Sequence, residues 1–175
     1  MKQTLPDVLL RPASHSAFSP FGTLVEMGRP AVTTNNGTAL RHDVDRFPAF
    51  EANPRSVLVT SIFEANGLFF PRAITMLERH PGSQQLIVPI SSSGHVVIVC
   101  PNRSDGAPDL RALAAFHFTG RQGMIYRPGA WHHPIFTLGR KSLFLVQSWQ
   151  NGDERDCEVA TILPVVVGRD STAFE

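Results

Sequence analysis

The chain has 175 residues, 42% of them hydrophobic, and its 16 basic and 15 acidic residues leave a formal net charge of +1. A near-neutral chain without a cluster of lysines or arginines argues against a nucleic-acid partner, and no apolar run reaches the roughly 18 residues of a membrane-spanning helix. The N-terminal segment lacks the apolar stretch of a secretory signal, and Cys100 and Cys157 form no disulfide framework, so we expect a cytoplasmic protein with no membrane contact.

Apolar, β-branched runs separated by turn residues predict strands along most of the chain. Clusters of Gly, Pro, Asn, Asp and Ser between the runs are typical of antiparallel hairpins. In chain order, the expected strands cover residues 21–27, 56–63, 86–90, 95–100, 112–118, 142–149 and 165–167. A short helix is expected near residues 14–18, and segment 110–116 fits either a helix or a strand. We therefore expect an all-β sandwich or barrel with few short helices, built as a single domain over residues 1–175.

Two histidine motifs are the strongest chemical signal, Glu-Arg-His-Pro at residues 78–81 and Trp-His-His-Pro at residues 131–134. On a strand, Glu78 and His80 project from the same face. Together with His132 they form a two-histidine, one-carboxylate set, which divalent iron, nickel or zinc can use. Without a metal, the same three residues suit acid and base catalysis. The residues alone leave both readings open, beside a structural one in which these side chains only stabilise the sheet.

Several neighbouring side chains are candidates for a binding pocket. Tyr126 and Trp131 flank the second motif and supply either aromatic pocket walls or core. Gln84 or Gln85 can add a neutral oxygen near the first motif. His133 is expected on the opposite side of its strand from His132, as a packing residue.

Arginines beside the expected strands are candidates for holding a small carboxylate, because a guanidinium binds it with two hydrogen bonds. The candidates are Arg41, Arg72, Arg79 and Arg127. The alternative is that most of them are solvated or pair with surface acids. Residues 35–37, Asn-Asn-Gly, predict a turn with positive φ.

These segments resemble the ureidoglycolate lyase family over nearly the whole chain, from about Phe18 to about Glu158. The matching segments are residues 18–22, 35–37, 77–81, 84–89, 108–110, 123–127 and 131–134. The resemblance implies a cupin-like double-stranded β-helix, a jelly-roll barrel, and commonly a homodimer.

The implied reaction is that of a carbon–nitrogen lyase, which splits ureidoglycolate, a small anionic ureido acid, into glyoxylate and urea during allantoin and purine breakdown. The resemblance implies that Glu78, His80 and His132 surround the reacting carbon, directly or through a divalent metal such as nickel. The implied substrate-binding residues are Asn35, Asn36, Gln84, Tyr126, Arg127 and Trp131.

The chain departs from the family pattern at two places. Glu64 stands where the family usually carries an arginine or a short Asn-Arg, and residues 147–149 are Gln-Ser-Trp in place of Val-Asp-Arg. A dry site would repel a substrate carboxylate held near Glu64. Two alternatives therefore stand beside the lyase, another cupin enzyme such as a metal-dependent dioxygenase or isomerase, and a non-catalytic binding protein.

Overall fold

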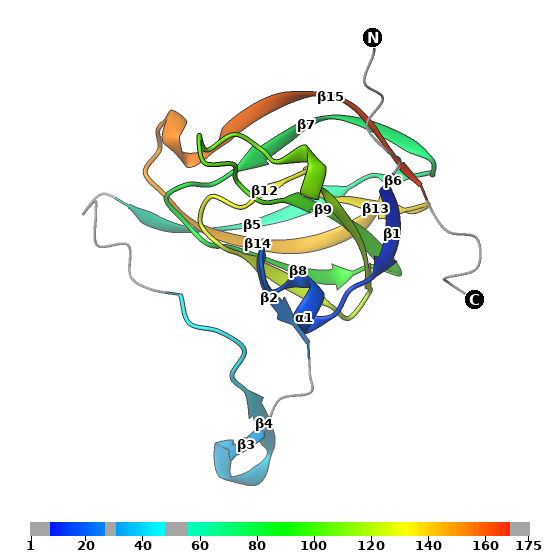
Figure 1. Ribbon diagram of the computed structural model, residues 1–175. Coiled ribbons are helices and arrows are strands. Elements are labelled where there is room, and N and C mark those ends of the chain that lie inside the picture. Colours follow the sequence, from blue (N-terminus) through cyan, green and yellow to red (C-terminus); the bar gives the residue numbers. More distant parts are fainter. Residues whose placement is uncertain (1–7, 27–30, 48–55, 169–175) are drawn as a thin grey trace.

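The computed structural model describes residues 8–26, 31–47 and 56–168, whose regular structure is almost entirely β-strand (Figure 1). The helical elements in these ranges are α1 (His15–Phe18) and the 3-10 turns η1 (Asn35–Gly37), η2 (Leu110–Ala112) and η3 (Glu154–Asp156). No helix in the described ranges has both the length and the apolarity to cross a membrane. The expected all-β class with few short helices is confirmed.

Of the three sheets in the described ranges, the largest closes on itself. Its strands are β1 (Val8–Pro12), β6 (Gly67–Leu68), β7 (Arg72–Arg79), β9 (Gly94–Cys100), β10 (Ala114–Thr119), β12 (Trp131–His132), β13 (Phe136–Leu138) and β15 (Glu158–Gly168). The order is β10-β1-β15-β7-β12-β9-β13-β6, and β9 also pairs with β10. Because β9 and β10 pair directly, strands β10, β1, β15, β7, β12 and β9 form a closed barrel. Each of these strands has a partner on both sides.

The second sheet packs against the first. Its strands are β2 (Gly22–Val25), β5 (Val57–Ala65), β8 (Gln85–Ser91), β11 (Gly123–Tyr126) and β14 (Ser142–Gln150), in the order β2-β11-β8-β14-β5. Its inner side chains, such as Met124 and Phe144, are buried against Val97 and Val99 of β9. The two facing sheets agree with the jelly-roll arrangement expected for a cupin-like chain.

Strand β9 is the centre of the barrel, because all seven of its residues are buried. Val97 and Val99 belong to the core between the two sheets, whereas Val96 and Ile98 belong to a second core on the other side of the strand. Successive side chains of a strand point to opposite faces, so one strand can serve two cores. An unbroken apolar run is therefore required here, and the sequence carries one.

The expected strands are found, with shifted ends. Segment 112–118 is mainly strand β10, preceded by the single turn η2, and the expected last strand at residues 165–167 is the end of the longer β15. The expected helix near residues 14–18 is α1, which the Ser14 hydroxyl caps by accepting from the Ala17 amide. Met27, the expected end of a strand, lies outside the described residues.

A hairpin projects from the barrel (Figure 1) and consists of β3 (Ala31–Thr34), η1 and β4 (Ala39–His42). We call residues 31–42 the arm. Its tip confirms the expected turn, since Asn35 and Asn36 have φ of 52° and 54°. Asparagine adopts this left-handed conformation more readily than most residues.

One buried histidine does not belong to either motif. His95 on β9 is fully buried between the rings of Phe118 and Phe144, and neither ring nitrogen has a hydrogen-bond partner. Burial lowers the pKa of His95 to about 3. In the unfolded chain His95 has an ordinary histidine pKa of about 6.5. Between pH 6.5 and about 3 the unfolded chain therefore binds a proton more readily than the folded chain.

We expect the His95→Leu substitution to flatten the pH dependence of stability. Because the folded pKa is depressed, the wild-type protein loses stability as pH falls through 6.5 towards 3, by about 2 kcal/mol between roughly pH 8 and pH 5. Urea unfolding at several pH values measures this loss. His15→Leu, at an exposed position on α1, is the matched control. An equal loss of stability in wild type and His95→Leu would contradict the argument.

Candidate active site

The structure brings together the three residues that the two motifs predicted. Glu78 lies near the end of β7, His80 follows that strand directly, and His132 on β12 pairs with Glu78 across the sheet. One ligand atom from each side chain lies within 4.8 Å of the others. His132 Nε2 is 3.5 Å from Glu78 Oε1, and the two imidazole rings are 5.3 Å apart.

Backbone carbonyl groups orient both imidazoles. The Nδ1–H of His80 donates to the Asp156 carbonyl at 2.6 Å, and the Nδ1–H of His132 donates to the Ala130 carbonyl at 2.8 Å. The Nε2 of His80 is then left with a lone pair. His80 Nε2 accepts from the Gln85 amide at 3.0 Å, whereas His132 Nε2 is buried without a hydrogen-bond partner. A hydrogen bond that fixes Nδ1 in this way orients the imidazole, so that Nε2 can bind a metal or a substrate proton.

The ionisation states of the site follow from burial and from the neighbouring groups. Burial opposes ionisation of Glu78, but its contact with His132 and the nearby His80 outweigh burial, so the pKa of Glu78 lies below its ordinary value. Burial lowers the pKa of His80 in spite of the bond to Asp156. Burial raises the pKa of Tyr126. At neutral pH the site therefore contains a carboxylate, a neutral His80 imidazole and a protonated phenol.

Tyr126 holds His132 in place. Its ring stacks on the imidazole with centroids 4.1 Å apart and an interplanar angle of 14°. Gly22 pairs with Tyr126 from β2, and a side chain at Gly22 would collide with the backbone carbonyl of Ile125. Glycine at this position thus lets β2 lie close behind the strand that carries Tyr126.

A cavity of about 180 Å³ lies beside these residues. Polar and apolar side chains both contribute to its lining. Its lining consists of Phe63, Glu64, Ala65, Glu78, Gln85, Ile87, Tyr126, His132, Pro134 and Ile135. A small cavity with few converging polar groups suits a small polar molecule.

Two of the residues implied as substrate-binding are placed elsewhere. Trp131 lies on β12 beside His132 but does not line the cavity, since neighbouring residues of a strand face opposite sides. Its ring packs under the Arg79 guanidinium at 4.6 Å, and its indole N–H donates to the Gly106 carbonyl. Gln84 does not line the cavity either, and its neighbour Gln85 does. Both differences concern which face of a strand a side chain occupies, and a role of either residue in substrate binding stays a prediction.

The remaining implied substrate-binding residues also lie apart from the cavity of their own chain. Arg127 is exposed after β11 and does not contribute to the lining. Asn35 and Asn36 lie at the tip of the arm, which points away from the barrel (Figure 1). Of the six residues, only Tyr126 lines the cavity.

Arg79 has a structural role, which agrees with the alternative that arginines beside the strands pair with acids. Its guanidinium binds Glu158 at 2.8 and 2.7 Å and also donates to the Asn102 side chain and the Gly106 carbonyl, both at 2.8 Å. These contacts tie β7 to β15 and to the loop at residues 101–109. Arg79 is thus occupied, and it lies on the side of β7 away from Glu78.

The family departures are accommodated locally. Glu64 at the cavity pairs with Lys141 at 2.6 Å, and both side chains are more than half exposed. Their charges cancel, which removes the repulsion expected for a substrate carboxylate near Glu64. Ser148 is buried and pairs with Gln85 across β14 and β8.

Comparison with known proteins identifies the family of this chain. The family model described as ureidoglycolate lyase matches residues 6–167. The ureidoglycolate lyase of Pseudomonas syringae pv. syringae (strain B728a) is 35% identical over 156 residues, covering 86% of this chain and 87% of the relative. That of Pseudomonas putida (strain W619) is 33% identical over 153 residues, covering 86% and 89%.

Among solved structures, the dTDP sugar isomerase from Desulfovibrio desulfuricans G20 aligns with a TM-score of 0.46 and 15% identity, over 81% of this chain and 85% of that one. RmlC from Streptococcus suis aligns with a TM-score of 0.45 and 11% identity, over 86% and 74%.

The motifs, the matched residues 6–167 and the identity to bacterial relatives agree, and the chain belongs to the ureidoglycolate lyase family.

Proposed function

We propose that this protein is a carbon–nitrogen lyase that cleaves ureidoglycolate into glyoxylate and urea. The observation that carries the proposal is the convergence of Glu78, His80 and His132 within 4.8 Å, with Glu78 and His132 lining a small cavity, in a chain of this family. The family match supports the lyase over the two alternatives, another cupin enzyme and a non-catalytic binding protein.

The reaction requires one proton to move. Ureidoglycolate is a carbinolamide, so loss of its hydroxyl proton forms the aldehyde of glyoxylate, while the electrons of the carbon–nitrogen bond pass to the ureido nitrogen. Glu78, ionised at neutral pH, accepts the hydroxyl proton and returns it to that nitrogen, which leaves as urea. His132 and Gln85 orient the hydroxyl and the ureido group, and the apolar wall excludes water.

The same three residues fit a divalent metal such as nickel. Two imidazoles with oriented Nε2 atoms and one carboxylate are a suitable donor set, and His132 Nε2 is a buried acceptor without a partner. A metal held by Glu78, His80 and His132 would supply Lewis acidity to the substrate oxygens.

We also propose a cytoplasmic homodimer. Both cysteines are free, which fits a reducing compartment. The outer face of the second sheet is apolar, and its exposed side chains include Leu58 at 44%, Ile62 at 59% and Leu143 at 37%. Exposed apolar side chains gathered on one sheet face are typical of a protein interface.

We expect His132→Ala to lower the release of glyoxylate and urea by about 100-fold, because it removes a group that contacts both Glu78 and the cavity. A coupled assay for both products measures the rate, and circular dichroism checks the fold. His15→Ala is the matched control. Unchanged turnover in His132→Ala would contradict the assignment.

We expect the wild-type protein to bind one nickel ion per chain, and Glu78→Gln or His80→Ala to lose this binding, since each removes one of three donors. Isothermal titration and metal analysis measure binding, and turnover is compared before and after chelation. Equal binding in the wild type and both variants would rule out a metal at this site.

We expect Ile62→Asp to convert the dimer to a monomer, because the substitution places a charge within the proposed interface. Sedimentation velocity measures the mass in solution. Val159→Asp, at an exposed position on β15 in the other sheet, is the matched control and should remain dimeric. A dimer that tolerates Ile62→Asp would place the interface elsewhere.

A further inference from the structure

The cavity lacks a partner for a substrate carboxylate. No arginine or lysine occurs among the described residues that line it, and Glu78 adds a negative charge. Lys141 does not line the cavity and pairs with Glu64, and Arg79 is held by Glu158. A small anionic substrate therefore requires a cation that the lining does not provide.

One wall of the cavity is also the free edge of a sheet. Residues 63–65 of β5 line the cavity, and within the described part of the chain β5 pairs only with β14. Val57, Ile62 and Phe63 on this strand are apolar and exposed. A long apolar edge strand is a template for pairing with another chain, and proteins normally cover or blunt it.

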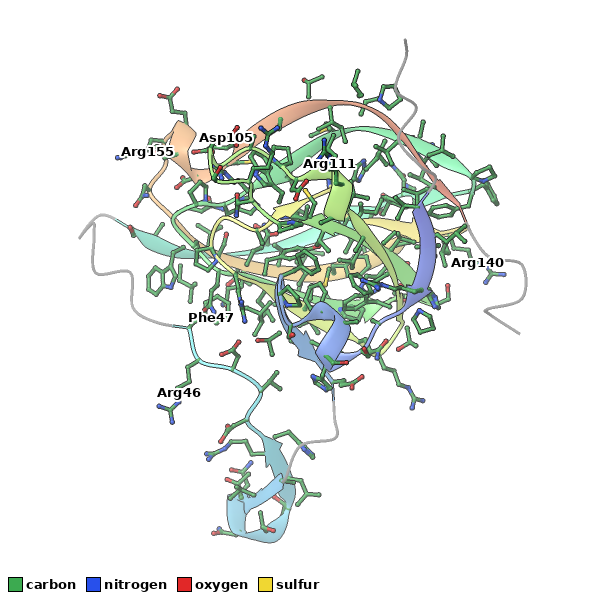
Figure 2. The ribbon with its side chains drawn as sticks, in the orientation of Figure 1. Arg46, Phe47, Asp105, Arg111, Arg140 and Arg155 are labelled. Atoms are coloured by element: carbon green, nitrogen blue, oxygen red, sulfur yellow. The ribbon has the colours of Figure 1, made fainter. Side chains whose placement is uncertain are left out.

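Within the described ranges, the two strands of the arm pair with each other and not with either of the larger sheets. The arm is thus a separate two-stranded sheet, and two-stranded hairpins alone are at best marginally stable in water. Its apolar side chains Val32 and Leu40 are 52% and 65% exposed. The arm projects away from the barrel, and Arg46 in the segment after it points into solvent (Figure 2).

The arm also carries the type of group that the cavity lacks. Arg41 on β4 is exposed and pairs with Asp43 at 3.1 Å, in an exposed pair of the kind that contributes little stability. Asn35 and Asn36 at the tip add amide groups, which can bind a ureido group. Arm and cavity are thus complementary in charge, and arm and β5 are complementary as unpaired strand edges.

We propose that the arm of a second copy of this chain adds to the β5 edge and brings Arg41 to the cavity, where it binds the substrate carboxylate. In a symmetric dimer the exchange is reciprocal, so each active site is built from two chains. Asn35 and Asn36 then reach a cavity that they do not reach in their own chain. The identity of the bound carboxylate rests on the proposed lyase function, whereas the exchange of arms does not.

Cross-linking tests the exchange without activity. One tagged chain carries Thr38→Cys, a differently tagged chain carries Thr60→Cys on β5, and both carry Cys157→Ser to remove the exposed native thiol. A short bis-maleimide should join the two chains. A pair with Arg121→Cys in place of Thr38→Cys, on the turn after β10, is the matched control and should not cross-link. Linkage only within a chain that carries both cysteines, or no linkage, would overturn the proposal.

Mixed dimers test the role of Arg41. His132→Ala chains with one tag and Arg41→Ala chains with another are co-expressed, and the doubly tagged dimer is purified. Each parent dimer should lose about 100-fold in turnover, and the mixed dimer should regain about half of the wild-type rate, because one of its two sites is intact. Arg121→Ala controls for loss of a surface charge. A mixed dimer as inactive as its parents would overturn the role of Arg41 in the partner's site.

The two experiments separate the proposals. If the wild type releases neither product, the lyase function fails and the cross-link still decides whether the arms exchange. If the wild type is active and the arms link only within one chain, the lyase function stands and the exchange fails.

Discussion

The site depends on one pairing, that of β12 with β7, which places His132 opposite Glu78. β12 has only two residues and is held between β7 and β9, so its register is set by both neighbours. The carbonyl groups of Ala130 and Asp156 then orient the two imidazoles. A slip of one residue would turn His132 away from Glu78 and bring Trp131 to the cavity. The pairing of β12 with β7 and β9 thus determines which side chains of β12 face Glu78 and the cavity.

The two charged residues at the end of β7, Glu78 and Arg79, face opposite sides of the strand that pairs with β12. The face of β7 that carries Glu78 turns to the histidines, and the next residue, Arg79, turns to Glu158 and the loop at residues 101–109. The loop in turn covers Trp131. One strand therefore supplies both a reactive carboxylate and the cation that anchors the outer layer. This division explains why the arginine next to the first histidine motif does not hold substrate.

Much of the fold and half of the site could be predicted from sequence. Period-two alternation and unbroken apolar runs such as that of β9 depend on local chemistry and predicted about half of the strands, whereas short strands such as β6 and β13 were not predicted. Glu78, His80 and His132 could be found because short motifs carry them. Local patterns could not show that Gln85, and neither Gln84 nor Trp131, lines the cavity, because the face of a residue depends on strand register, which long-range pairing sets. The position of the arm depends on contacts that no local pattern encodes.

The arm and the β5 edge each expose groups that a protein normally covers. A ribbon with exposed Val32 and Leu40 gains little stability alone, and an apolar edge beside the cavity exposes unpaired backbone groups to any passing strand. Pairing of the arm with the β5 edge within a dimer would cover the apolar side chains of the arm and the unpaired backbone groups of β5. Strands of other proteins could then no longer pair with this edge, because it is already occupied. The cavity would then be closed only after the dimer has formed. Dimer formation and substrate binding would then be coupled, since a monomer would keep the catalytic triad without the cation that holds the substrate.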